Sequence, residues 1–400
     1  MQSSEAFKAY INKVCQQVRW KRMHPSIAEE LETHLYDQRD AFQAEGDDAQ
    51  AAADKALREM GDAIIVGQRF DAAHRPKPQW AMLGAVAALL LIGLGLRLFL
   101  FPEIGLFDSL PIKLFAYGIG IAVLLAAYFA DFSLLGKHPY AFANIVVFTT
   151  LCAYILFPGL MNGRRVWLTP TGGSINVLYI LLPLYPLVVA VLIYANRGKN
   201  KAAILMVCTA LAVFAGLVIM QAADFNMLRW QAAFRPELDP TGYGFFPLLT
   251  RELLSGAKWL GRGEIPAVYS DYIRNSAVFY NDVLLTSIAI RMGWAAVAAV
   301  LAVFAALFAM GFRLCYKQKS VLGKLVSFTI LFTLAAQLLS YVVYNMGFQL
   351  FPPQSLPLVS HGNAALVVNM GLVGLMLSVF RTGSAVKDVQ PVKKKKRIAA

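Results

Sequence analysis

The sequence has few charged residues and few cysteines. Only 15% of its 400 residues are charged, whereas 58% are hydrophobic and the mean hydropathy is +0.55, a composition that indicates a membrane protein. The cysteines (Cys15, Cys152, Cys208, Cys315) and the five histidines are scattered, so we expect neither a disulfide framework nor a metal site. No long apolar run precedes Trp80, so we also expect no cleavable signal peptide.

Acidic residues are scarcer than basic ones, with 24 Asp and Glu against 37 Lys and Arg and a net charge of +13. The basic residues gather at the ends of apolar runs and in the tail, residues 393–397. Membrane proteins keep their cytoplasmic charge at such positions. We therefore predict contact with anionic membrane lipids and no nucleic-acid partner.

Residues 1–76 predict a small, soluble, cytoplasmic domain of three or four helices. Ile27, Leu31 and Leu35 recur at helical spacing, and Gly46 and Gly61 follow two of the predicted helices. The pattern EL…HLYD…G…A…A…MGD resembles the prefix domain fused ahead of many bacterial permease-like proteins. We expect a structural or docking module without chemistry of its own.

Eight apolar runs follow the proline-containing linker, and each can cross a bilayer, which takes about 20 residues. They predict an all-α, polytopic membrane helix bundle within residues 77–382, followed by a basic cytoplasmic tail, residues 383–400. The predicted spans are Trp80–Phe101, Ile112–Ala130, Ala141–Leu160, Ile175–Ala195, Ala202–Ala222, Val283–Phe312, Leu325–Phe348 and Ala364–Phe380.

Loop charge predicts the orientation of these spans. Segments 196–201 and 313–324 and the tail are basic, and all three lie on one side if the spans alternate from a cytoplasmic amino terminus. The carboxyl terminus is then cytoplasmic as well, and the long loop 223–282 lies outside. The pair Arg164–Arg165 is an exception, because it falls on the outer side.

The stretch Arg229–Trp294 is the longest polar insertion among the spans, and loops of this length are usually functional or disordered. Asp282 stands where the next apolar run begins, which suits either a helix N-cap or a reactive carboxylate. Asp271 is a rival carboxylate in the same loop. Within the predicted spans, Gln337 and Asn345 suit hydrogen bonds between helices.

Two segments on the predicted outer side, PELDPTGYGFF…SGAKWLGRG…NDVLLTSIAIRMGW and LPLVSHGNAALVVNMG, carry a family resemblance. They resemble the motifs of the SEDS family, the FtsW/RodA-like membrane glycosyltransferases, across about residues 80–382. The matching residues are Gly163, Arg165, Trp167, Pro236, Glu237, Asp239, Pro240, Gly242, Gly244, Gly261, Gly263, Asp282, Gly293, Leu356, Pro357, Ser360 and Gly362. The glycines are expected to serve backbone turns rather than to touch a ligand.

The chain also departs from the family pattern. Eight spans are predicted where the family has ten, the Q-P-S-E motif is absent, and E-E-L-G has become Ile290-Arg-Met-Gly293.

The resemblance implies polymerisation of lipid II, a lipid-linked disaccharide-peptide, into peptidoglycan in the bacterial cytoplasmic membrane during division, elongation or sporulation. It implies Asp282 as the general base and a class B penicillin-binding-type transpeptidase as partner. The pyrophosphate needs positive charge from side chains or from a divalent cation, and no other cofactor is expected. The candidate substrate-binding residues are Arg229, Arg235, Lys258, Arg262, Arg164, Arg165 and Ser360.

Two other functions stay open at this point. The lost motifs suit a non-catalytic scaffold or regulator of a cell-wall synthesis complex. A flippase for a lipid-linked precursor is the third reading, but it would need charges along a central cavity. Arg97 and Arg291 are the intramembrane charges that the sequence suggests.

Overall fold

The computed structural model describes residues 2–100, 106–156, 160–161, 164–165, 167–168, 174–175, 180–198, 201–223, 227–270, 273, 278–350, 354–360 and 363–383. The backbone divides into two compact units, residues 1–78 and residues 79–380. Helices dominate the described residues of both units, which confirms the predicted all-α class. The four described strands have two residues each and form two antiparallel pairs: β1 (Leu160–Met161) with β2 (Arg164–Arg165), and β3 (Trp167–Leu168) with β4 (Ser174–Ile175).

The first unit is a bundle of four helices: α1 (Gln2–Gln17), α2 (His24–Ala44), α3 (Ala49–Met60) and α4 (Ala63–His74), with a 3-10 turn η1 (Lys21–Met23). The carboxylate of Asp48 accepts hydrogen bonds from the backbone N–H groups of Gln50 and Ala51 and so caps α3. Asp62 caps α4 in the same way. These local signals explain why the helix positions were readable from the sequence.

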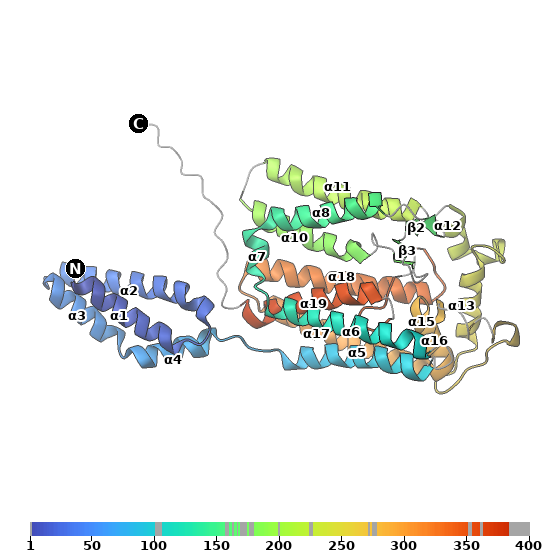
Figure 1. Cartoon of the computed structure of the whole chain (residues 1–400), viewed down its shortest axis with the longest axis horizontal. Helices are drawn as coiled ribbons and strands as arrows, with labels where there is room; N and C mark the ends of the chain where they lie inside the picture. Colours follow the sequence, from blue (N-terminus) through green and yellow to red (C-terminus); the bar gives the residue numbers. More distant parts are fainter. Residues whose placement is uncertain are drawn as a thin grey trace. The chain divides into compact units, whose positions relative to one another are not determined.

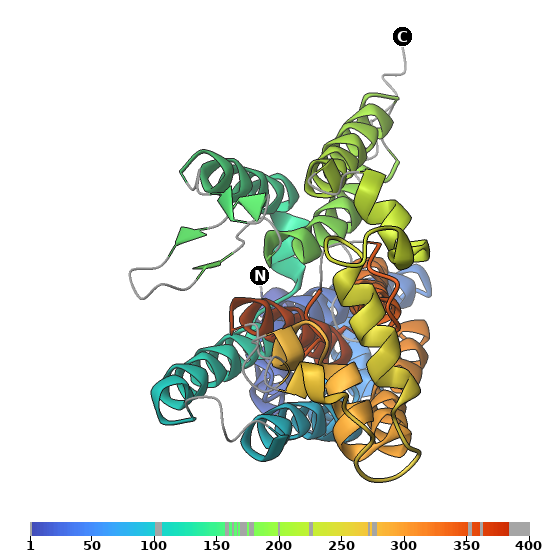
Figure 2. The same ribbon diagram turned by 90° about the vertical axis from the view of Figure 1, so that its right-hand side faces the viewer.

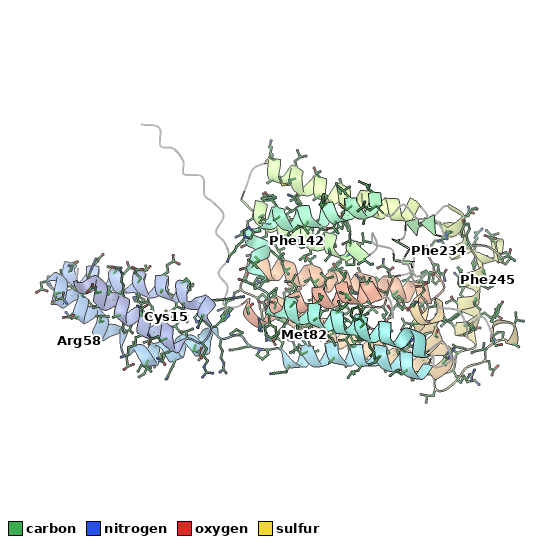
Figure 3. The ribbon with its side chains drawn as sticks, in the orientation of Figure 1. Cys15, Arg58, Met82, Phe142, Phe234 and Phe245 are labelled. Atoms are coloured by element: carbon green, nitrogen blue, oxygen red, sulfur yellow. The ribbon has the colours of Figure 1, made fainter. Side chains whose placement is uncertain are left out.

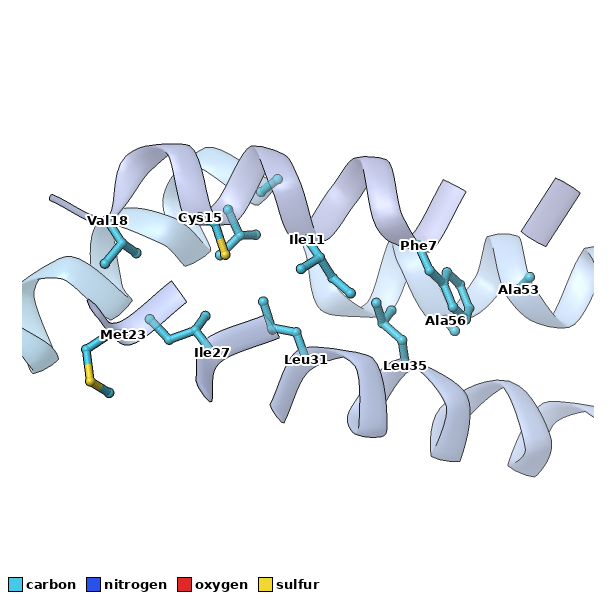
Figure 4. Packing of buried hydrophobic residues seen from close by; sticks show 12 residues of the cluster. Phe7, Ile11, Cys15, Val18, Met23, Ile27, Leu31, Leu35, Ala53 and Ala56 are labelled. Carbon is cyan, nitrogen blue, oxygen red and sulfur yellow. The ribbon is translucent and has the colours of Figure 1, made fainter. Parts of the chain in front are cut away.

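The core of this unit is a stripe of apolar side chains between α1 and α2 (Figure 4). Phe7, Ile11 and Cys15 of α1 face Ile27 and Leu31 of α2. Burial raises the pKa of the Cys15 thiol, so the side chain packs as a neutral, small hydrophobic group. The described residues of the unit offer no cluster of metal-ligating side chains.

The second unit is a bundle of long helices (Figure 1). Its membrane-crossing candidates are α5 (Trp80–Leu100), α6 (Leu106–Phe129), α8 (Pro139–Leu156), α10 (Tyr185–Asn196), α11 (Lys201–Ala223), α17 (Trp294–Tyr316), α18 (Val321–Asn345) and α19 (Asn363–Thr382), with short α7 (Ser133–Lys137) and η2 (Leu182–Leu184) between them. Phe142 and Met82 mark two of these helices in Figure 3.

Within the part of the chain that the structure describes, four helices are long and apolar enough to cross a bilayer by themselves, namely Trp80–Leu98, Trp294–Tyr316, Val321–Asn345 and Ala364–Thr382. Shorter apolar helices cover Leu114–Phe129, Pro139–Ala153, Leu182–Asn196 and Lys201–Phe214. Together they match the eight predicted spans in order, and the chain is a polytopic membrane protein.

Among the predicted spans whose bounds differ from the structure, the fourth and the sixth bear on the site. The fourth was expected to begin at Ile175, but Ile175 lies in β4 and the α-helix begins at Tyr185, where Pro183 and Pro186 restrict the first turn. The sixth was expected to be continuous from Val283, but it is broken at Gly293, whose φ is 97°. The break separates a short helix from α17, so Arg291 lies at the end of the short helix rather than within a span.

Candidate functional site

Six short elements are described between α11 and α17, and all but the last of them lie within the predicted outer loop, residues 223–282. They are α12 (Met227–Phe234), η3 (Pro236–Leu238), α13 (Phe245–Ser255), η4 (Ala267–Tyr269), α15 (Val278–Asn281) and α16 (Leu284–Met292). Figure 1 shows α12, α13, α15 and α16 together at one end of the second unit, and Figure 2 looks onto this end. Phe234 and Phe245 mark it in Figure 3. We call it the α12–α16 end.

The first motif, residues 236–244, forms a turn held by one carboxylate. The Asp239 side chain accepts hydrogen bonds from the backbone N–H groups of Gly242 at 3.1 Å and Tyr243 at 2.7 Å. A Cβ at Gly244 would clash with the carbonyl oxygen of Pro236. Asp239 and Gly244 therefore fix the backbone ahead of α13, as expected for the glycine.

The second motif, Gly261 and Gly263, pairs with the break between α16 and α17. The N–H groups of Gly261 and Gly263 donate to the carbonyls of Met292 (3.1 Å) and Ile290 (2.8 Å) at the end of α16. In return, the N–H of Trp294, the first residue of α17, donates to the Lys258 carbonyl at 3.0 Å. The loop thus satisfies backbone groups that the two helix ends would otherwise leave unpaired.

Asp282 lies in the turn between α15 and α16 and is half-buried. The residue at the N-cap position of α16 is Val283, and its apolar side chain makes no hydrogen bond to the first backbone N–H groups of the helix. The structure therefore places Val283, and not Asp282, at the N-cap position that the sequence suggested for the aspartate. From the next turn onward α16 is fully buried, from Leu284 to Ile290.

Two side chains of α18 take over the contacts to this turn. The Tyr341 hydroxyl accepts from the N–H of Leu284 and donates to the carbonyl of Asn281, both at 2.9 Å. The Asn345 amide donates to the carbonyl of Asp282 at 3.1 Å. Bonding of Asn345 between helices was predicted and is confirmed, whereas no sequence pattern indicated the role of Tyr341.

Asn345 also accepts hydrogen bonds from Thr286. The backbone N–H of Thr286 donates to Asn345 Oδ1 at 3.1 Å, and its hydroxyl donates to the Asn345 carbonyl at 3.0 Å. Gln337, which was also expected to bond between helices, has a buried Oε1 without a hydrogen-bond partner in the described residues, so that prediction was wrong for this oxygen.

Arg251 of α13, which the sequence analysis missed, connects α12 to the end of α18. Its guanidinium donates to the carbonyls of Ala233 at 2.7 Å and Gly347 at 3.2 Å and lies 4.8 Å from the Phe348 ring. Gly347 follows Asn345 by two residues. The end of α12 is thereby joined to the same region of α18 that holds Asp282.

The predicted substrate-binding cations occupy different parts of this end. Arg229 of α12 lies over the Tyr243 ring, 4.9 Å from its centroid, and Arg235 lies just after α12. Lys258 forms an ion pair with Glu264 at 3.3 Å.

Lys258 and the exposed Arg262 belong to the loop that holds the α17 end of α16. The nine residues of α16 separate that end from the Asp282 turn by about 14 Å, at about 1.5 Å per residue. Lys258 and Arg262 are thus grouped with each other rather than with Asp282.

The remaining predicted residues lie elsewhere in the second unit. Ser360 is buried in the segment ahead of α19, and its hydroxyl oxygen has no hydrogen-bond partner in the described residues. The backbones of Arg164 and Arg165 form β2, while their side chains lie outside the description. Gly163, Gly362, His361 and the rival carboxylate Asp271 lie outside the described residues.

A groove runs beside α12. It has a volume of about 400 Å³ and is lined by Trp230, Gln231, Phe234, Arg235 and Leu238. Aromatic and aliphatic walls with one guanidinium suit a ligand that carries both an apolar part and a negative charge.

Comparison with known proteins gives one curated relative and several solved structures. No family model matches the chain. The probable peptidoglycan glycosyltransferase FtsW of Thioalkalivibrio sp. is 27% identical over 164 residues, which is 40% of this chain and 40% of the relative. The chain thus spans about two-fifths of the length of this relative.

The solved structures show the fold. The rod shape determining protein RodA of Thermus thermophilus is 17% identical with a TM-score of 0.55, and the match covers 76% of this chain and 97% of RodA. An aspartate-to-alanine variant of RodA and a chain from a peptidoglycan synthase complex give TM-scores of 0.55 and 0.53 at 18% and 16% identity. The second unit resembles the SEDS proteins in sequence and has their fold.

Proposed function

We propose that this chain, with its SEDS-like motifs on a RodA-like fold, polymerises a lipid-linked disaccharide of the lipid II type into glycan strands for the cell wall. The proposal places the α12–α16 end outside the cytoplasmic membrane, with both termini in the cytoplasm. The observation that carries it is Asp282, a half-buried carboxylate at the α12–α16 end of this fold, in a turn held by a neighbouring helix.

The reaction needs a base at the attacking sugar. In the proposed step, a hydroxyl oxygen of the acceptor sugar forms a bond to the anomeric carbon of the donor and transfers its proton to the Asp282 carboxylate. The bond between the anomeric carbon and the phosphate oxygen breaks, and the polyprenyl pyrophosphate leaves with the bonding electrons. A half-buried carboxylate in the turn ahead of a buried helix is suited to this transfer.

The leaving pyrophosphate needs positive charge close to the reacting carbon. Arg229 and Arg235 are the favoured described candidates, because Arg251 joins α12 to the part of α18 that holds the Asp282 turn. Arg164, Arg165 and Ser360 stay in the proposed set. Lys258 and Arg262 are less suited to this phosphate, since the length of α16 separates them from Asp282.

The groove beside α12 supports the choice of an amphiphilic substrate. Trp230 and Phe234 offer an apolar wall beside Arg235, which fits a polyprenyl chain next to its pyrophosphate. A divalent cation could supply further charge at the phosphates. The proposed protein partner is a class B penicillin-binding-type transpeptidase, since one structural neighbour belongs to a peptidoglycan synthase complex.

A non-catalytic scaffold is the second candidate, and one observation favours it. Several motif residues stabilise the backbone of the loop rather than contact a ligand, namely Asp239, Gly244 and Gly263. A scaffold protein that used this loop for docking would need the same residues. The two functions differ in what they require of Asp282, because only the glycosyl transfer needs its carboxylate as a base.

Reconstitution of the full chain in liposomes tests the proposal. Wild type and Asp282→Ala would be supplied with fluorescent lipid II, with magnesium or with a chelator, and the glycan products separated by length. Wild type is expected to form long strands and Asp282→Ala none. Equal product from both would remove the assigned role of Asp282, and no product from wild type with its transpeptidase present would favour the scaffold.

A further inference from the structure

The start of α16 is unusual because its backbone is capped from another helix. The first N–H groups of a helix have no partner within it and are normally capped by a side chain at the cap position. Here Leu284 donates to the Tyr341 hydroxyl and Thr286 donates to Asn345 Oδ1, across 57 and 59 residues of sequence. The residue at the N-cap position, Val283, has an apolar side chain that cannot provide such a cap.

The same two side chains also hold the turn that precedes the helix. Tyr341 donates to the carbonyl of Asn281, and Asn345 donates to the carbonyl of Asp282. Four hydrogen bonds from two residues of α18 thus fix the backbone on both sides of the Asp282 Cα. Both side chains are fully buried, with an exposed fraction of 0%.

Burial of these polar groups within a membrane-spanning helix requires a compensating role. A buried hydroxyl or amide is tolerated when its hydrogen bonds are satisfied, and an apolar residue would pack α18 without this requirement. The Tyr341 hydroxyl and both polar atoms of the Asn345 side chain bond to residues 281–286, and a further Asn345 bond goes to Tyr341 in its own helix. Their polar atoms therefore serve the Asp282 turn.

We propose that Tyr341 and Asn345 are positioning residues: they cap the start of α16 and hold the Asp282 backbone so that its carboxylate faces the substrate. This inference rests on the proposed function. In this inference α18 fixes the position of the Asp282 carboxylate. A general base needs such a fixed position, since a displacement of about 1 Å at a reacting group can lower the rate about 100-fold.

Four variants of the full chain test the proposal. Tyr341→Phe removes both hydroxyl bonds and keeps the ring, and Asn345→Ala removes the amide. Tyr185→Phe is a matched control, because the Tyr185 hydroxyl is also buried and bonds to Thr150 at 2.8 Å between α8 and α10. Asp282→Asn removes the charge of the proposed base without changing its size.

Two measurements are made on each variant. The rate of amide hydrogen exchange in the peptide spanning residues 281–287 reports how often the Asp282 turn and the start of α16 open. Polymerisation of fluorescent lipid II reports kcat and KM. We expect Tyr341→Phe and Asn345→Ala to accelerate exchange in this peptide and to lower kcat about 100-fold, with KM changed less than about threefold.

The controls separate positioning from folding. Tyr185→Phe is expected to leave exchange in residues 281–287 and kcat at wild-type values. Asp282→Asn is expected to lose activity while its exchange stays at the wild-type rate, because the cap comes from α18.

Three results would overturn the proposal. The first is a wild-type kcat in Tyr341→Phe together with faster exchange, which would leave a purely structural role. The second is unchanged exchange in both α18 variants. The third is an Asp282→Asn variant that exchanges as fast as Tyr341→Phe. An inactive wild type would overturn the proposed function and the positioning role with it, while the exchange data would still report whether α18 caps α16.

Discussion

Gly293 occupies a position that no other residue type fits. Its φ of 97° lies in the left-handed region, and a Cβ there would come within 2.6 Å of the Trp259 carbonyl oxygen. That carbonyl accepts a hydrogen bond from Ala295 at 3.1 Å, so it cannot move away without breaking the start of α17. The backbone conformation and the close Trp259 carbonyl are thus sufficient to explain why a glycine occupies position 293.

Gly293→Ala is predicted to destabilise the chain by about 2 kcal/mol or more, because it combines an unfavourable φ with a steric clash. Thermal unfolding of the purified protein in detergent measures the change. Gly84→Ala is the matched control, since Gly84 is exposed on α5 and a Cβ there meets no atom within 4 Å. The control should be neutral or stabilise by up to about 1 kcal/mol. Equal stability of both variants would contradict the explanation.

Cys15 offers a reporter for the first unit. It is buried, and burial raises the pKa of its thiol, so the reactive thiolate is scarce near neutral pH. In a chain whose other three cysteines are replaced by alanine, we predict that maleimide labels Cys15 only as fast as the unit opens. Labelling at the rate of a free thiol in the folded protein would contradict the buried position.

At the scale of helices, α16 begins in a different way from α3 and α4. In the first unit, α3 and α4 are capped by the residues directly ahead of them, Asp48 and Asp62. In the second unit, α16 is capped by Tyr341 and Asn345 from a distant helix. The first kind of cap can be predicted from a short stretch of sequence, whereas the second needs the three-dimensional fold.

Asp48→Ala should destabilise the first unit by about 1 kcal/mol through loss of the α3 cap. Opening would then be about fivefold more frequent, and maleimide labelling of Cys15 in the full chain should accelerate by the same factor. Asp54→Ala is the control, because Asp54 is exposed on α3 and accepts one side-chain bond from Gln50 at 3.4 Å. The cap assignment fails if both variants label Cys15 at the wild-type rate.

The membrane-spanning helices of the second unit could be predicted because each belongs to an apolar run. The sequence did not show the break at Gly293, because apolar residues continue on both sides and the cause is the loop that carries Gly261 and Gly263. It also could not separate Lys258 from Asp282, since both belong to one loop in sequence and to opposite ends of α16 in space. Asp282 itself was found from its motif position, and its side-chain role stays a prediction.

At the scale of the whole molecule, the account requires a defined orientation in the membrane. The 23 residues of α17 give about 35 Å of helix, enough to cross the hydrocarbon core. Its first residue, Trp294, bonds to the loop of the α12–α16 end, and its last, Tyr316, is followed by the basic segment that loop charge predicts to be cytoplasmic.

Single-cysteine labelling tests this orientation. Val268 and Tyr316 are both strongly exposed, at 85% and 77%, and lie at opposite ends of the predicted path. In a background without native cysteines, an impermeant maleimide should label Val268→Cys in intact cells and Tyr316→Cys only after permeabilisation. The reverse pattern would place the α12–α16 end in the cytoplasm and exclude the proposed reaction there.

The central claim is that Asp282 is the base of a glycosyl transfer at the α12–α16 end, and its most direct test compares two carboxylates of the same loop. Initial rates of lipid II polymerisation would be measured for wild type, Asp282→Asn and Glu237→Gln, where Glu237 is exposed in η3. The account predicts a fall of about 100- to 10,000-fold for Asp282→Asn and a wild-type rate for Glu237→Gln. A wild-type rate for Asp282→Asn would contradict it.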